Sequence, residues 1–326
     1  EVPEVRAMIN HESNLHPRLQ EWLQAYNAYL RQLLSTGFRV TPTNAREGLS
    51  TLTRQWTQDK VELPWIQDEL ILPAQGYQVP VRIYHPDPSA ALPVLVYYHG
   101  GGHMAGSVAD YDPICRRIAY HTQQILVSVD YRLAPECPYP AGLEDAVHSA
   151  KYVWAALESR NVAYQPRLRL GGDSAGGALS ATVAHLAQYD PGLQVEAQIL
   201  IYPSLDYTMS SPSIDEYQSG FLLQKQNIQW YFDNYFQRGE DRKKVSPLFM
   251  EVAGSYPATL VVSAGFCPLQ DEAEAYVEKL RQGGITAEHL HFPDLMHAFM
   301  NMERLFPERI QELNQALQAF LGRDFD

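Results

Sequence analysis

The feature that most constrains the fold is a repeated alternation of short apolar runs with helical segments, beginning near residue 93. The apolar runs are VLVYY (94–98), ILVSV (125–129), LRL (168–170), QILIY (198–202) and TLVVS (259–263). Helical patterns separate them around 113–121, 143–158, 175–188 and 271–282, and a last helix is expected near 308–321. Continuous apolar strands that alternate with helices are typical of a parallel sheet covered on both faces. The sequence therefore predicts an α/β fold.

The residues before 93 and the interval between 202 and 259 do not follow this alternation of strands and helices. Residues 14–34 place apolar side chains at helical intervals and predict an amphipathic helix, whereas residues 40–60 are mixed and predict a loop with a short helix. Residues 69–86 then predict two strands around a glycine-containing turn. The long interval between the strands at 202 and 259 predicts an insertion over one end of the sheet, and such segments often cover a site.

Charge and cysteine usage exclude several classes of protein. The chain has 38 acidic and 25 basic residues, a formal net charge of -13, so its surface repels phosphate backbones and nucleic acid is not an expected partner. The three cysteines have no metal-ligand spacing, and free thiols in a reducing, cytoplasmic compartment are expected. No apolar run approaches the roughly 20 residues of a membrane span.

A serine stands in a glycine-rich turn between a strand and a helix. The segment GGDSAGG (171–177) contains the pattern G-x-S-x-G as Gly172, Ser174 and Gly176. A sharp turn from strand to helix exposes the serine hydroxyl, and small neighbours let backbone pack against backbone. An ordinary strand–helix turn is the alternative interpretation, since Gly/Ser turns are common.

A second glycine-rich segment, HGGGH (99–103), directly follows the strand at 94–98. Three consecutive glycines permit a loop whose N–H groups point into one cavity, as an oxyanion hole requires. A phosphate-binding loop is the alternative, but no Lys or Arg lies within ten residues. The two glycine-rich segments together are more specific than either alone.

A general base is expected after the last strand, and His297 lies there in FPDLMHAF (292–299). His99 and His103 compete by proximity to the glycine loop. In hydrolases with a serine elbow the histidine comes last, after the nucleophile and the acid, and this order favours His297.

With these motifs in view, the chain resembles the hormone-sensitive-lipase-like (bacterial family IV) carboxylesterases. Further segments match that family: YRLAPE (131–136), PYPA (138–141), Asp145, SPL (246–248) and CPLQDE (267–272). The resemblance covers roughly residues 65–320. It implies an α/β-hydrolase fold with a mostly parallel eight-stranded sheet and a helical cap. Residues 1–60 would form the N-terminal part of the cap, and residues 61–326 the catalytic domain with a cap insertion at about 205–240.

The resemblance also implies roles for individual residues. Ser174 would be the nucleophile and His297 the general base, and the N–H groups of Gly101, Gly102 and Ala175 would form the oxyanion hole. His103 and Phe221 are expected to line the substrate pocket. Supporting roles near the glycine loop are implied for His99, Arg132 and Glu136.

One position departs from the family pattern, because Cys267 stands where the family has its catalytic acid. Three readings are open: another carboxylate has taken over, the thiol itself occupies the position, or catalysis is lost. Asp271, one helical turn further on, is the nearest substitute, with Glu272 behind it. Asp294 is a weaker candidate, since a side chain in the histidine's own loop reaches the correct nitrogen less readily. Asp271 could equally serve only as the cap of its helix.

The resulting expectation is an esterase that cleaves short-chain acyl esters through a serine acyl-enzyme, with no cofactor and no metal. A small-molecule ester is the expected partner, and a homodimer is a further expectation from the resemblance. An amidase or arylformamidase would use the same machinery. A non-catalytic ligand-binding homologue is the alternative from another class, if the missing acid abolishes activity.

Overall fold

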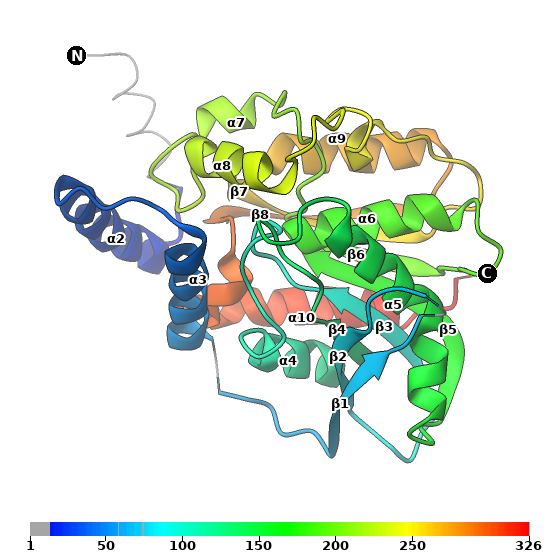
Figure 1. Cartoon of the computed structure of the whole chain (residues 1–326). Coiled ribbons are helices and arrows are strands. Elements are labelled where there is room, and N and C mark those ends of the chain that lie inside the picture. Colours follow the sequence, from blue (N-terminus) through cyan, green and yellow to red (C-terminus); the bar gives the residue numbers. More distant parts are fainter. Residues whose placement is uncertain (1–13, 58, 74, 326) are drawn as a thin grey trace.

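The computed structural model describes residues 14–57, 59–73 and 75–325 and contains one eight-stranded sheet (Figure 1). The strand order is β1-β2-β4-β3-β5-β6-β7-β8. β1 and β2 pair antiparallel, as do β2 and β4, and all later pairs are parallel. The strands are β1 (Trp65–Ile71), β2 (Val79–His85), β3 (Leu92–Tyr98), β4 (Ile125–Val129), β5 (Tyr164–Asp173), β6 (Ala197–Ile201), β7 (Ala258–Phe266) and β8 (Ala287–Met296). The predicted mostly parallel eight-stranded sheet is confirmed.

The central strands are buried on both faces, which explains their largely apolar sequences. Every residue of β4 and β6 is buried, whereas β1 at one end of the sheet mixes exposed and half-buried residues. Successive side chains of β3 enter two separate hydrophobic cores: Leu95 and Tyr97 enter one, and Val96 and Tyr98 the other. This alternation is the two-residue repeat of a strand between two layers of helices.

Helices cover both faces of the sheet (Figure 1). α4 (Asp112–Thr122) and α10 (Pro307–Leu321) contribute to the core that contains Tyr97. α5 (Ala141–Glu158) and α9 (Gln270–Gln282) contribute to the core that contains Tyr98, and α6 (Ala175–Ala187) borders both cores. Within the described residues, no helix combines the length and the hydropathy needed to cross a bilayer.

The N-terminal part contains two long helices, α2 (Pro17–Ser35) and α3 (Pro42–Trp56). The short helix expected within residues 40–60 is therefore wrong in length, because α3 has 15 residues. Its start is fixed by a reciprocal cap, in which Thr41 Oγ1 accepts from the Asn44 N–H and Asn44 Oδ1 accepts from the Thr41 N–H. Residues 1–13 of the predicted cap part lie outside the described residues.

The insertion after β6 contains α7 (Ser213–Glu216) and α8 (Lys225–Tyr235), and two 3-10 helices complete the chain, η1 (Pro247–Phe249) and η2 (Phe299–Leu305). The Asn27 side chain of α2 donates to the carbonyl of Gly220 at 2.9 Å, so the N-terminal helix and the insertion touch although they are far apart in sequence. Both lie at the end of the sheet where Figure 1 shows the loops after β3, β5 and β7.

Candidate active site

Ser174 occupies a strained elbow between β5 and α6. Its φ of 53° and ψ of -116° lie outside the conformations that side chains normally favour. Only glycine fits beside it, because a Cβ on Gly176 would lie 1.8 Å from the Tyr98 carbonyl oxygen. A Cβ on Gly172 would likewise lie 2.3 Å from the backbone of Gly176. Gly172 and Gly176 therefore allow the close backbone packing of this turn, which presents the serine hydroxyl.

His297 lies directly after β8 and reaches this hydroxyl. Its Nε2 is 2.9 Å from Ser174 Oγ, the distance of a nucleophile–base hydrogen bond. The side chain is buried, and burial lowers the pKa of His297 to about 3. The imidazole is thus neutral across the ordinary pH range and can accept the serine proton.

The other nitrogen of the imidazole contacts a sulfur atom. Cys267 Sγ lies 3.2 Å from Nδ1 of His297, and the Leu269 N–H donates to the same sulfur at 3.4 Å. Cys267 is buried, and burial raises the pKa of its thiol, so the sulfur is uncharged at neutral pH. A neutral thiol holds the place that an ionised carboxylate takes in a serine hydrolase triad.

The expected substitute carboxylate, Asp271, contacts the insertion in this structure. Its carboxylate accepts from the Ser213 N–H at 2.8 Å, and its own N–H donates to Ser213 Oγ. Asp271 is the second residue of α9, which begins at Gln270, and its side chain reaches the insertion rather than His297. It fastens α7 to α9.

The two other acidic candidates are also engaged elsewhere. Oε1 of the fully buried Glu272 accepts from the Leu205 N–H at 2.7 Å, and burial holds the pKa of this carboxyl well above its usual range. Asp294 forms an ion pair with Arg309 at 2.9 Å. Among the described residues, neither Glu272 nor Asp294 bonds to His297, and the group in contact with its Nδ1 is Cys267.

The glycine loop faces Ser174 because β3 and β5 are neighbours, with Tyr98 opposite Gly172 in the register. Gly101 and Gly102 have φ values of 127° and 63°, which favour glycine. Their N–H groups have no acceptor among the described residues. Ala175 is the first residue of α6, where an N–H has no partner within the helix. Ala175 directly follows Ser174, and the role of the three N–H groups as an oxyanion hole stays a prediction.

Asp173 ties this loop to the elbow, a role that the sequence analysis missed. Its carboxylate accepts from the Gly100 N–H at 3.0 Å and from the hydroxyls of Tyr97 and Tyr111 at 2.9 and 2.8 Å. Complete burial raises the pKa of Asp173 to about 6, although these three donors oppose the shift. The residue next to the nucleophile therefore sets the position of the loop opposite it.

A second missed contact is made by Arg46 of α3. Its guanidinium donates to the carbonyls of Met104 and Ala134 at 2.7 and 2.9 Å, and it pairs with Glu136. Arg132 instead holds Asp145. The YRLAPE segment is thus braced by an N-terminal helix, and no local sequence signal reveals that contact.

The two residues expected to line the substrate pocket are mainly buried. His103 stacks on Tyr235 of α8 with centroids 3.8 Å apart, and its Nε2 lies 3.0 Å from the Tyr207 hydroxyl. Phe221 packs against Phe266 with centroids 5.3 Å apart. His99, stacked on Tyr131, is fully buried at the base of the loop. The assignment of His103 and Phe221 to a substrate pocket stays a prediction.

Tyr231 of α8, in the insertion, lies beside Gly102 of the glycine loop. A Cβ built on Gly102 would lie 2.6 Å from its ring, so the ring covers that glycine directly. The position could not be read from the sequence, since the apolar residues of the insertion follow no regular period.

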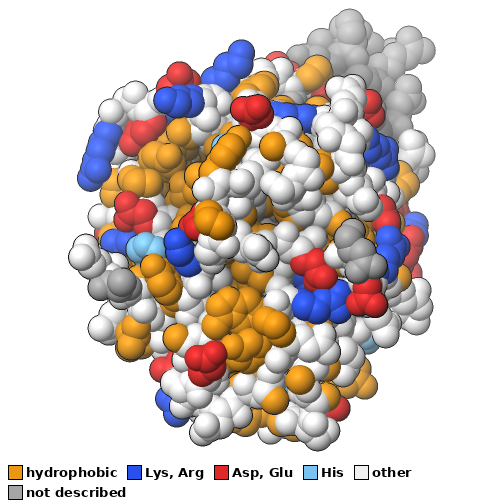
Figure 2. Space-filling view, turned by 90° about the vertical axis from the view of Figure 1, so that its right-hand side faces the viewer, with side chains coloured by type: hydrophobic (Ala, Val, Ile, Leu, Met, Phe, Trp, Pro, Cys, Tyr) orange, Lys and Arg blue, Asp and Glu red, His pale blue; other side chains and the backbone are white. Residues whose placement is uncertain are grey.

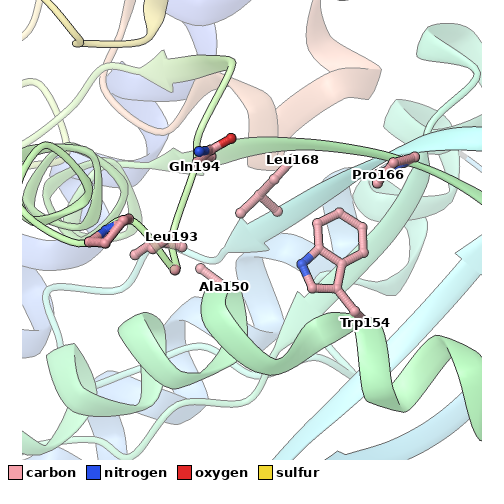
Figure 3. A pocket seen from close by; sticks show the side chains of 8 residues that line it. Ala150, Trp154, Pro166, Leu168, Leu193 and Gln194 are labelled. Carbon is pink, nitrogen blue, oxygen red and sulfur yellow. The ribbon is translucent and has the colours of Figure 1, made fainter.

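A separate hollow of about 220 Å³ lies at the other end of β5 (Figure 3). Ala150 and Trp154 of α5 face Leu168 and the loop that contains Leu193. It contains neither Ser174 nor His297. On the side of the molecule where β5 and the C-terminus lie, hydrophobic side chains gather in patches, with acidic and basic groups scattered around them (Figure 2). Within the described part of the chain, no cluster of three or more His, Cys, Asp or Glu side chains is arranged to hold a metal ion.

Comparison with known proteins agrees with this geometry. Residues 95–301, which include Ser174 and His297, match the family model described as the alpha/beta hydrolase fold. The chain belongs to the α/β-hydrolase family. Within that family it is a carboxylesterase of the hormone-sensitive-lipase-like group, because relatives with this activity match most of its length.

Three similar proteins match most of this chain. The carboxylic ester hydrolase LipN of Mycobacterium tuberculosis is 37% identical over 78% of this chain and 70% of its own. The ethyl acetate hydrolase of Pseudomonas putida is 31% identical over 94% of this chain and 98% of its own. The solved structure of the Pyrobaculum calidifontis esterase has 30% identity and a TM-score of 0.81, covering 94% of this chain and 99% of that one. This α/β hydrolase therefore acts on carboxylic esters.

Proposed function

We propose that this α/β hydrolase cleaves short-chain acyl esters through an acyl-enzyme on Ser174, with His297 as general base and Cys267 in place of the acid. The observation that carries the proposal is the continuous contact from Ser174 Oγ to Nε2 of His297 and from Nδ1 to Cys267 Sγ. A serine hydrolase needs a nucleophile bonded to a base that a third group orients, and the three side chains have this arrangement.

In the first half of the reaction, Ser174 Oγ attacks the ester carbonyl carbon while its proton passes to Nε2 of His297. The carbonyl oxygen becomes an oxyanion, and the N–H groups of Gly101, Gly102 and Ala175 are the proposed donors that stabilise it. Collapse breaks the bond to the alkoxy group, which leaves as the alcohol with the proton from Nε2. Water then attacks the acyl-enzyme by the same steps and releases the acid.

Cys267 acts in these steps through the histidine. For Nε2 to accept the serine proton, Nδ1 must carry the hydrogen, and Sγ accepts it together with the Leu269 N–H. The sulfur thus holds the productive tautomer and the ring orientation. Being neutral, it stabilises the imidazolium less than a carboxylate does, so the proposed enzyme is slow rather than inactive.

The size of the substrate follows from the proposed cap, formed by the helices within residues 1–60 and the insertion at 205–240. Its support is the ring of Tyr231 over Gly102 and the bond from Asn27 to Gly220 that joins the two cap parts. A wall this close to the oxyanion donors favours short acyl chains. No observation favours an amide or formamide substrate over an ester.

The compartment and the assembly are further parts of the proposal. Cys115, Cys137 and Cys267 are free thiols, which supports a reducing, cytoplasmic location. A homodimer is proposed from the family resemblance alone, and sedimentation at several protein concentrations would decide it.

The test of the reaction class is labelling with a fluorophosphonate probe, which forms a covalent bond only with an activated serine. We expect labelling of the native protein at Ser174 and none of Ser174→Ala. Heat-unfolded protein is the control, since it retains the serine but not the contact with His297. Absence of labelling in the native protein, or equal labelling of Ser174→Ala, would reject the proposed nucleophile.

A further inference from the structure

A cavity of about 380 Å³ lies beside the carboxyl ends of β7 and β8, outside the proposed active site. Its volume is that of a small-molecule pocket. Neither Ser174 nor His297 lines it. The residues around it come from the chain before α2, the end of α7, β7, β8 and the start of α9: Asn14, Tyr217, Gly265, Phe266, Gln270, His291, Pro293 and Asp294.

Two hydrogen-bond acceptors among these residues are buried without a partner. They are Oε1 of Gln270 and Oδ1 of Asp294. The other atom of each group is used: the Gln270 amide donates to Glu274 at 3.2 Å, and Asp294 Oδ2 accepts from Arg309 at 2.9 Å. An amide flip would therefore break a bond rather than remove the unpaired oxygen. Buried acceptors of this kind are unfavourable unless a donor reaches them.

His291 supplies a third acceptor through a chain of hydrogen bonds. Ser263 Oγ lies 2.8 Å from Nδ1 of His291 and 2.7 Å from Nε2 of His289. When the serine donates to His289 and accepts from His291, the free Nε2 of His291 has a lone pair. Burial lowers the pKa of His291, so the ring is neutral and can accept. Nε2 has no partner among the described residues.

The charges around the cavity favour a cation over an anion. Asp294 and Glu274 carry negative charge, and Glu274 is close enough to act on both His289 and His291. Arg309 is the opposing charge, and it is already paired with Asp294 and Glu312. The rings of Phe266 and Tyr217, with centroids 6.0 Å apart, supply an apolar wall.

We propose that this cavity binds a primary ammonium group carried on a small apolar or aromatic molecule. A primary ammonium has three N–H donors and no acceptor. The cavity offers three acceptors that lack donors, Gln270 Oε1, Asp294 Oδ1 and His291 Nε2. The aromatic wall accommodates the organic part and attracts the cation through its ring faces. The site is additional to the ester-binding site and does not depend on the proposed catalytic roles.

The test is isothermal titration of the full chain with 2-phenylethylammonium chloride. We expect saturable binding that weakens about tenfold or more in Asp294→Asn and in Gln270→Met, since each removes one charge-assisted hydrogen bond. Asp59→Asn, which removes an exposed carboxylate that does not line the cavity, and Ser174→Ala should bind as the wild type does. Gln270→Met keeps the ion pair of Asp294 with Arg309, so it decides the matter if Asp294→Asn fails to fold.

Two analogues of the probe separate the proposed recognition from general apolar binding. 2-Phenylethanol lacks the charge, and the trimethylammonium analogue keeps the charge but has no N–H donor. We expect both to bind about tenfold more weakly than the primary ammonium. Equal binding of either analogue, equal binding by the two cavity variants, or no binding of the primary ammonium up to about 10 mM would overturn the proposal.

Discussion

The two sides of the Ser174–His297 pair are built very differently. On the serine side, Asp173 accepts three hydrogen bonds of 3.0 Å or less, and glycines allow backbone contacts that no other residue fits. On the acid side, one sulfur makes contacts of 3.2 and 3.4 Å to His297 and Leu269. The orientation of a catalytic histidine and the charge that supports it are therefore separable. The thiol of Cys267 orients the ring of His297 but carries no charge.

The largest effect is expected from removing the base that joins the two sides. His297→Ala leaves Ser174 without a proton acceptor, and we expect kcat for p-nitrophenyl acetate to fall by about 10⁶. His121→Ala, at a half-buried position on α4 that contacts neither Ser174 nor His297, is the control and should change the rate less than about twofold. A fall of only tenfold would mean that another group takes the serine proton.

Asp173→Ala removes the carboxylate that accepts three hydrogen bonds on the serine side of the pair. It leaves the Gly100 N–H and two tyrosine hydroxyls buried without an acceptor, each at a cost of about 1–3 kcal/mol. We expect a loss of roughly 3 kcal/mol or more in the free energy of unfolding and a tenfold or larger fall in kcat. Denaturant unfolding and ester hydrolysis measure the two effects. Asp190→Ala, which removes a carboxylate paired with Lys151 at the surface, is the control and should leave the free energy of unfolding nearly unchanged.

The smallest effect is expected from Asp271→Asn. The amide oxygen still accepts from the Ser213 N–H, and the contact with His297 is made by Cys267. We expect kcat for p-nitrophenyl acetate to change less than about twofold. A fall of a hundredfold would show that Asp271 reaches the histidine during turnover, and the thiol would then not be the working partner.

The nucleophile, the glycine loop and the base could be predicted from the sequence, because each is recognisable from its own short segment. Ser174, the glycine loop and His297 each follow a strand of the sheet, and the ends of its parallel strands lie at one edge, so the sheet itself brings them together. The order of the strands was not predicted, because the apolar runs do not say which strands pair, and β4 lies between β2 and β3. The length of α3 was not predicted, because its start depends on the capping bonds between Thr41 and Asn44 rather than on apolar spacing.

The acid could not be predicted because its position depends on the direction of side chains at the start of α9. Asp271 is only four residues from Cys267 in sequence, yet its carboxylate contacts the insertion. The contact of Arg46 and the position of Tyr231 were missed for a related reason. Both reach the glycine loop from segments far away in the chain, and no motif encodes such contacts.

The most direct test of the account is to restore the charge with Cys267→Asp and compare pH profiles of kcat/KM for p-nitrophenyl acetate. Wild-type His297, with its pKa lowered to about 3, stays neutral until strongly acidic pH, so its rate should fall only there. An aspartate beside Nδ1 raises the pKa of the histidine and stabilises the imidazolium. We therefore predict that kcat/KM of the variant at pH 7 is higher by on the order of 10², and that its acid limb moves to higher pH. An unchanged rate with an unchanged limb would contradict the account, because Cys267 would then not hold the acid's place.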